Sequence, residues 1–235
     1  MIITKSRKLV YIILISLITF VIYYPGLFGD YVFDDMPNIV ENQKLRIEHL
    51  NKNEILSAFW SGDAGPLGRP ISMLSFAFNY YFTGLDPFYF KLTNIFIHII
   101  NSILVYFVSY KIFKRLFIST CNNKIFLMAG IVSLVWAIHP LNLTSVLYIV
   151  QRMTSLSALF GFLAILSYCC WREIKNIYSL SSVLTLFFIG TCLILSVYTK
   201  ESGALFIPLI YWIELLIFNG RDRNNKEIYL SLIHI

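Results

Sequence analysis

Apolar residues in this chain come in blocks of helix length, and this pattern constrains the fold more than any other feature of the sequence. A helix of roughly 17–25 apolar residues is long enough to cross the hydrocarbon core of a bilayer. Of the 235 residues, 57% are hydrophobic and 14% are charged, whereas soluble domains carry about 25% charged residues. The sequence therefore predicts an all-α, polytopic transmembrane helix bundle with about six crossings. The six blocks are residues 9–28, 88–110, 125–139, 154–171, 177–198 and 204–218.

Basic residues at the ends of the blocks predict the orientation. With a cytoplasmic N-terminus, 12 of the 19 Lys and Arg residues fall in short cytoplasmic segments, and two, Arg152 and Lys200, in short outer ones. This distribution accounts for the net charge of +6 without a nucleic-acid partner. The first block is too long for a signal peptide and lacks a cleavage site, so we expect a retained helix. The Ile-, Lys- and Asn-rich composition favours the inner membrane of an AT-rich bacterium, with a eukaryotic endoplasmic reticulum as the alternative.

The segment between the first two blocks, residues 29–87, is a long and acidic outer loop. It holds eight of the 13 acidic residues of the chain. Two stretches in it, residues 54–60 and 71–82, have an amphipathic pattern and predict helices that lie in the membrane interface. A loop of this length in a compact membrane protein is usually functional.

Polar residues gather at the outer ends of the blocks. An acidic pair and several cations on one membrane face suit a site for an anionic, lipid-linked substrate. The alternatives are a solvated acidic loop and basic side chains that snorkel to the interface. Within the second block, Asn94, His98 and Asn101 share one helix face, as in a hydrogen-bonding stripe between helices or as part of the site. The residues at the outer ends are Asp34, Asp35, Arg69, His139, Arg152, Lys200 and Glu201.

Metal and disulfide patterns give no assignment. The four cysteines lack ligand spacing and are expected to pack as small apolar side chains. A single acidic pair makes no strong case for a divalent metal, so we assign no metal site and no cofactor, and the question of a divalent cation stays open.

Eight short motifs follow one another in an order that resembles the membrane domain of the O-mannosyltransferases with C-terminal tetratricopeptide repeats. These enzymes and their bacterial relatives are members of the GT-C superfamily of glycosyltransferases. Two departures are mild: Gln151 stands where the family usually has Gly, and Thr199 where it has Ser. The motifs are residues 31–35, 69–72, 79–80 and 84–88, Asn94 with His98, and residues 136–140, 150–152 and 199–202.

The resemblance implies transfer of a sugar from a polyprenyl-phosphate carrier to an acceptor hydroxyl, with inversion, outside the cytoplasm. Asp34 matches the first acid of the superfamily's loop motif and becomes the candidate general base, with Asp35 beside it. Arg152 and Lys200, together with Arg69 and Glu201, become the candidate donor-binding group at the lipid phosphate. Asn94, His98 and His139 are expected to be structural or to line the cavity. The implied partners are the lipid-linked sugar, a protein or glycan acceptor and the bilayer.

The superfamily has more crossings than this chain, and we therefore expect residues 1–229 to be a partial GT-C domain that need not be active alone. Residues 230–235 look like translated sequencing adapter and are expected to be a non-native tail. Two other classes remain open. A transporter would use His98 and Glu214 inside the membrane, although no inverted repeat is visible. A non-catalytic membrane scaffold would not need acids and cations around one cavity.

Overall fold

The computed structural model describes residues 2–174 and 176–218, and within these ranges every regular element is helical. The expected non-native tail, residues 230–235, lies outside them. The helices are α1 (Ile2–Tyr23), η1 (Tyr24–Phe28), η2 (Met36–Val40), η3 (Gln43–Leu45), α2 (Lys52–Phe59), α3 (Pro70–Thr83), α4 (Pro87–Leu116), α5 (Asn122–Ala137), α6 (Asn142–Leu147), η4 (Ile149–Gln151), α7 (Arg152–Trp171), α8 (Leu180–Thr199), η5 (Glu201–Leu205), α9 (Phe206–Ile213) and η6 (Glu214–Phe218).

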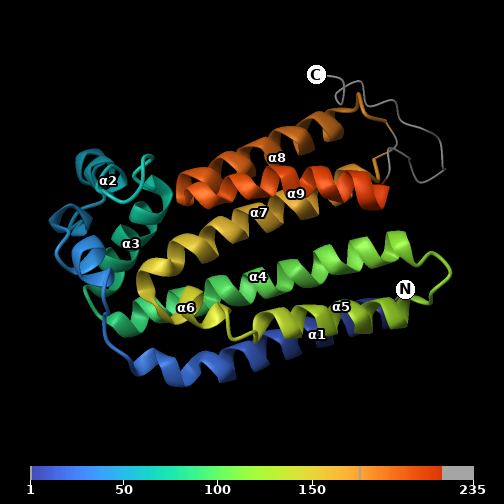
Figure 1. Cartoon of the computed structure of the whole chain (residues 1–235), viewed down its shortest axis with the longest axis horizontal. Coiled ribbons are helices and arrows are strands. Elements are labelled where there is room, and N and C mark those ends of the chain that lie inside the picture. The colour runs from blue at the N-terminus through green and yellow to red at the C-terminus, as the bar shows by residue number, and fades with distance from the viewer. Residues whose placement is uncertain (1, 175, 219–235) are drawn as a thin grey trace.

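Long apolar helices run side by side and form the body of the molecule (Figure 1). In the described chain five segments are long and apolar enough to cross a membrane: residues 8–28, 87–116, 149–171, 180–199 and 201–218. Helix α5 is a sixth, shorter apolar helix of 16 residues, or about 24 Å at 1.5 Å per residue. The prediction of an all-α polytopic bundle is confirmed, and this protein is a multi-pass membrane protein.

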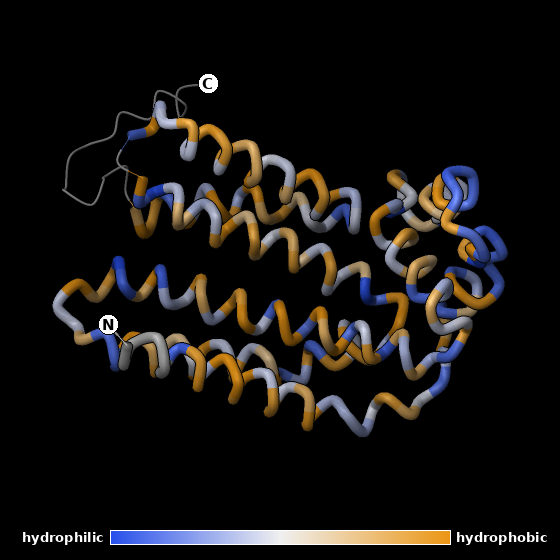
Figure 2. The backbone as a smooth tube through the Cα atoms, turned by 180° about the vertical axis from the view of Figure 1, so that it is seen from behind, coloured by the Kyte–Doolittle hydropathy of each residue, from blue (hydrophilic) through white to orange (hydrophobic). Residues whose placement is uncertain are grey.

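The long first loop folds into helices at one end of the bundle, as the amphipathic pattern predicts. Helices α2 and α3 lie at the end opposite the N-terminus (Figure 1). Figure 2 shows that this end is the most hydrophilic part of the backbone trace. Asn51 caps α2 by accepting a hydrogen bond from the N–H of Glu54, and Asp86 caps α4 by accepting one from Phe88. Capping and a proline at the first turn therefore fix where α4 leaves the polar loop.

A polar stripe on α4 holds the bundle together below this end. The Asn94 amide donates to the carbonyl of Ile149, and the Asn101 amide donates to that of Ser155. The His98 ring lies 2.8 Å from the carbonyl oxygen of Ala137, at the end of α5. One face of α4 thus bonds to η4, to α7 and to the end of α5, which is how polar groups stabilise packing inside a bilayer.

Candidate functional site

The acidic pair sits on a tight turn that leaves one carboxylate exposed and buries the other. Phe33 has φ of +44°, in the left-handed region that non-glycine residues seldom adopt. After this turn the Asp34 side chain is exposed, whereas Asp35 is fully buried. The backbone N–H of Asp34 donates to the hydroxyl of Tyr148 at 2.9 Å. Asp34 is therefore open to a substrate, and Asp35 anchors the turn.

Asp35 anchors the turn through backbone groups. Its carboxylate accepts hydrogen bonds from the N–H groups of Val32 at 3.0 Å and Val150 at 2.7 Å. Burial raises the pKa of the Asp35 carboxyl, while these bonds, a third from the N–H of Ile149 and the positive charge of Lys91 oppose the rise. The loop is thus tied directly to the helical segment that leads into α7.

Lys91 is the charged residue in this region that sequence analysis missed. Its side chain is only 5% exposed, and a Cβ placed on Gly29 would lie 2.6 Å from its ammonium nitrogen. The sequence did contain a signal: Lys91 precedes Asn94 by three residues and so extends the stripe of Asn94 and His98 by one turn. Lys91 lies at the end of the stripe nearest the acidic turn, and its positive charge therefore acts on Asp35.

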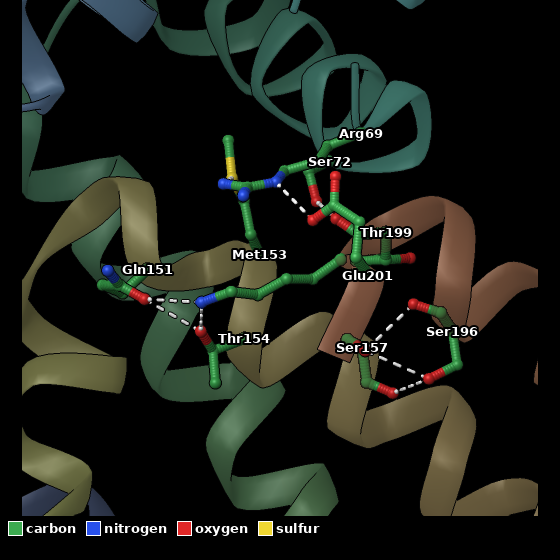
Figure 3. A network of polar contacts seen from close by, with 10 residues as sticks. Arg69, Ser72, Gln151, Met153, Thr154, Ser157, Ser196, Thr199 and Glu201 are labelled. Atoms are coloured by element: carbon green, nitrogen blue, oxygen red, sulfur yellow. Dashed lines mark hydrogen bonds and ion pairs between the residues drawn. The ribbon is translucent and has the colours of Figure 1, made fainter. Parts of the chain in front are cut away.

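A second cluster of charges lies where α3 begins, next to the connection between α8 and η5. Arg69 donates through Nε to Glu201 at 3.0 Å, and Figure 3 shows the two side chains facing each other. Arg69 has φ of +49° and, with Phe33, is one of two non-glycine residues with positive φ in the described chain. Strained backbone of this kind concentrates at functional sites, so each outlier marks one half of the candidate site.

The loop before α3 closes over this ion pair. A Cβ placed on Gly65 would lie 2.1 Å from Oε1 of Glu201, and the φ of Gly65 is +76°. A side chain at this position would therefore meet both a steric clash and an unfavourable backbone conformation. The close approach of the loop to Glu201 depends on a glycine.

Lys200 lies beside the ion pair and reaches toward the start of α7. Its ammonium donates to the hydroxyl of Thr154 at 2.7 Å and to the side-chain carbonyl of Gln151 at 3.3 Å. Burial lowers the pKa of Lys200, the nearby positive charge of Arg69 lowers it further, and Glu201 opposes the change. Its partners are neutral, and Lys200 therefore remains available to an anion.

Arg152 occupies a different place from that expected of a residue that touches a lipid phosphate. Its side chain is fully buried. Four of the five guanidinium N–H groups donate to protein acceptors, and the group lies 4.7 Å from the ring of Phe76. The acceptors are the side-chain oxygens of Asn79 and Asn94 and the carbonyls of Ser75 and Phe90. Since no face of Arg152 is open, the structure revises its expected role from phosphate contact to holding α3, α4 and α7 together.

One short segment, residues 148–154, bonds to both the acidic turn and the cationic cluster. Tyr148 and Val150 bond to the acidic turn, and Gln151 and Thr154 bond to Lys200. Between them, Arg152 holds α3 and α4, and the sulfur of Met153 accepts a hydrogen bond from Arg69. The 148–154 segment therefore fixes the acidic turn and the cationic cluster relative to each other.

The remaining candidates lie elsewhere. Asn94 and His98 are buried in the helix contacts described above. His139 is exposed, accepts a hydrogen bond from the N–H of Leu141, and lines an apolar groove with Trp136. Among residues 2–174 and 176–218, no three His, Cys, Asp or Glu side chains are grouped closely enough to hold a metal ion.

The fold and this polar end define a multi-pass α-helical membrane protein with an acidic turn and a cationic cluster joined at one end of its bundle. Human protein O-mannosyl-transferase TMTC1 is 30% identical over 198 residues, which are 77% of this chain and 21% of the relative. Human TMTC4 is 30% identical over 219 residues, 88% of this chain and 29% of the relative. Drosophila melanogaster Tmtc3 is 28% identical over 216 residues, 85% of this chain and 23% of the relative.

The chain is therefore a homologue of the TMTC protein O-mannosyl-transferases over most of its own length, and the resemblance drawn from its motifs is confirmed. It spans between about a fifth and three-tenths of the length of these relatives. No protein-family model and no solved structure matches it.

Proposed function

We propose that this chain forms part of the active site of a GT-C membrane glycosyltransferase. The enzyme transfers a sugar, mannose by analogy with the relatives' names, from a polyprenyl-phosphate donor to a hydroxyl of a protein or glycan acceptor. The observation that carries the proposal is the 148–154 segment, because it ties an exposed carboxylate to a partly buried ammonium. These are the two kinds of group that such a transfer needs close together.

The proposed reaction is a single displacement. Asp34 accepts the proton of the acceptor hydroxyl while the oxygen forms its bond to the anomeric carbon of the sugar. The bond between that carbon and the phosphate oxygen breaks at the same time on the opposite face, which inverts the configuration. The departing polyprenyl phosphate gains negative charge, and Lys200 stabilises it, with Arg69 beside it. Asp35 and Arg152 position these groups without touching the substrate.

Glu201 has an indirect part in this scheme. A carboxylate would repel the donor phosphate, but Glu201 is engaged with Nε of Arg69. One N–H of NH1 also donates to the sulfur of Met153, so the NH2 group and the second N–H of NH1 remain as donors to other acceptors. Glu201 therefore orients Arg69. Arg69, Glu201 and Lys200 together carry one net positive charge at the donor side.

We also propose the orientation that the basic residues predict, with the N-terminus in the cytoplasm and the acidic turn outside. The bacterial inner membrane stays a prediction from composition, because the curated relatives above are animal proteins.

The test is binding and transfer with the purified chain in liposomes, using polyprenyl-phosphate mannose as donor. We expect saturable donor binding that Lys200→Ala weakens, and that the matched change Lys124→Ala, at an exposed lysine near the other end of the bundle, leaves intact. Mannose transfer to an acceptor peptide is scored in the same vesicles. If Lys200→Ala and Lys124→Ala bound the donor equally well, the assignment of Lys200 to the donor site would be contradicted. Uptake of a solute by sealed vesicles without any donor binding would favour the transporter instead.

A further inference from the structure

The side chain of Tyr148 contacts Asp34 at two points. Its hydroxyl accepts a hydrogen bond at 2.9 Å from the backbone N–H of Asp34. The same hydroxyl is hydrogen-bonded to the carboxylate of Asp34. A carboxylate accepts hydrogen bonds and a hydroxyl has one proton to donate, so this second bond runs from Tyr148 to Asp34. One hydroxyl therefore holds both the backbone and the side chain of the candidate base.

The bundle fixes the position of this hydroxyl. The N–H of Tyr148 donates to the carbonyl of Thr144 at 3.2 Å, and its carbonyl accepts from the N–H of Gln151 at 3.0 Å. The ring is partly buried and packs against the hydrophobic cluster of buried residues around Phe76. Side chains held by packing and backbone bonds keep a functional group in one geometry before the substrate arrives. The hydroxyl is thus a preorganised contact for Asp34.

The Tyr148 hydroxyl keeps its proton at neutral pH and is available as a donor. Burial raises the pKa of Tyr148 above its ordinary value, the hydrogen bond from the Asp34 N–H opposes the rise, and the negative charges of Asp34 and Asp35 add to it. A protonated phenol beside a carboxylate donates to it, whereas a phenolate would repel it. The protonated form is therefore the one that holds Asp34.

Three consecutive residues hold the acidic pair. The side chain of Tyr148 bonds to Asp34, whereas the N–H groups of Ile149 and Val150 donate to the Asp35 carboxylate. Asp35 is thus committed to the backbone. Asp34 is exposed, and its two carboxylate oxygens offer about four acceptor positions, so the bond from Tyr148 leaves room for an acceptor hydroxyl.

We propose that Tyr148 is a positioning residue that holds the Asp34 carboxylate in the orientation in which it takes the proton of the acceptor hydroxyl. This role rests on the proposed function of Asp34 as the general base. An exposed carboxylate without such a contact rotates freely, and a reacting group misplaced by about 1 Å can lose about 10²-fold in rate. Tyr148 touches the base and acts on the substrate only through it. Its loss should therefore lower kcat and leave the KM for the donor unchanged.

The test compares Tyr148→Phe with the wild type, using the whole chain in liposomes and polyprenyl-phosphate mannose as donor. Phenylalanine keeps the ring and its packing and removes only the hydroxyl. We expect kcat to fall by about ten- to a hundredfold, with the KM for the donor unchanged. In an Asp34→Asn background, Tyr148→Phe should bring no further loss, because no base remains to be positioned. Tyr89→Phe removes a hydroxyl from an exposed ring near the start of α4 and should transfer like the wild type.

Hydrogen exchange gives a second measurement that needs no substrate. Tyr148→Phe removes the acceptor of the Asp34 N–H, so exchange at this amide should accelerate, whereas the Val150 amide, which Asp35 holds, should exchange as in the wild type. No transfer by the wild type would contradict the proposed function, and exchange at Asp34 would still decide whether Tyr148 holds it. Unchanged exchange at Asp34, a wild-type kcat in Tyr148→Phe, or an equal further loss in the Asp34→Asn background would overturn the inference.

Discussion

The carboxylate of Asp35 accepts a 2.7 Å hydrogen bond from the backbone N–H of Val150, a residue 115 positions further along the chain. One residue after Val150, the side chain of Gln151 accepts a hydrogen bond from Lys200. The first long loop and the connection between α8 and η5 are therefore linked through a single stretch of backbone. Substitutions of Asp34, Asp35, Arg152 and Lys200 are therefore expected to have different effects.

Replacing Asp35 with Ala should loosen the acidic turn. The N–H groups of Val32 and Val150 would lose their acceptor, and a buried unpaired donor costs about 1–3 kcal/mol. Hydrogen exchange should accelerate at these two amides and leave the amides in the middle of α8 unchanged. The matched variant Glu48→Ala, at an exposed loop carboxylate, should exchange like the wild type. Unchanged protection at Val150 would contradict the anchoring role of Asp35.

Replacing Asp34 with Asn should slow transfer and preserve donor binding. Asparagine keeps the size of the side chain but cannot accept the proton, and general-base catalysis is worth about 10²- to 10⁴-fold. The measurement is mannose transfer and donor affinity in liposomes, with Glu48→Gln as the control. Near-normal transfer by Asp34→Asn would remove this carboxylate from the reaction.

Replacing Arg152 with Ala should destabilise the fold. Four acceptors would lose a charged donor inside the bundle, and we expect a loss of about 3 kcal/mol or more in the free energy of unfolding. Arg152→Lys should recover little, because an ammonium cannot reproduce the planar set of donors. Thermal unfolding in detergent measures both, with Lys52→Ala as an exposed control. A stable Arg152→Ala that has lost donor binding would restore the direct phosphate contact expected from the sequence.

Donor binding should weaken as the pH rises. Burial and the charge of Arg69 lower the pKa of Lys200 below 10.5, so its ammonium loses its proton at a lower pH than an ordinary lysine. Only the protonated form attracts the phosphate, and affinity should therefore be full at neutral pH and fall in the alkaline range before pH 10.5 is reached. In Lys200→Arg the guanidinium stays charged, and the fall should disappear. The same alkaline fall in Lys200→Arg would assign it to another group.

Single cysteines can test the orientation. Phe33 and Ile118 are 85% and 83% exposed and lie at opposite ends of the bundle, so substitution disturbs little packing. With the native cysteines replaced by serine, an impermeant thiol reagent should label Phe33→Cys in intact cells. Ile118→Cys should be labelled by the same reagent only after the cells have been permeabilised. The reverse pattern would invert the proposed topology.

The patterns of hydropathy and charge predict most of the fold from this sequence. Block length predicts the long helices because a bilayer core sets their minimum length, and amphipathic spacing predicts α2 and α3 in the first long loop. The site is harder to predict, because exposure and burial depend on tertiary contacts. Neighbouring acids look alike in a sequence, yet the left-handed turn at Phe33 exposes Asp34 and buries Asp35. The sequence likewise suggests that Arg152 is a surface anchor, whereas in the structure it is buried and donates hydrogen bonds to Asn79 and Asn94.

The short length of α5 has a consequence for the surrounding lipid. A helix of 16 residues spans about 24 Å, whereas a typical hydrocarbon core is about 30 Å thick. Hydrophobic mismatch of this size is relieved when the bilayer thins locally or the flanking residues reach outward. Where the bilayer thins, lipid headgroups are drawn inward along α5, toward the cavity that Lys114 and Asn122 line at its start and toward the groove of Trp136 and His139 at its end.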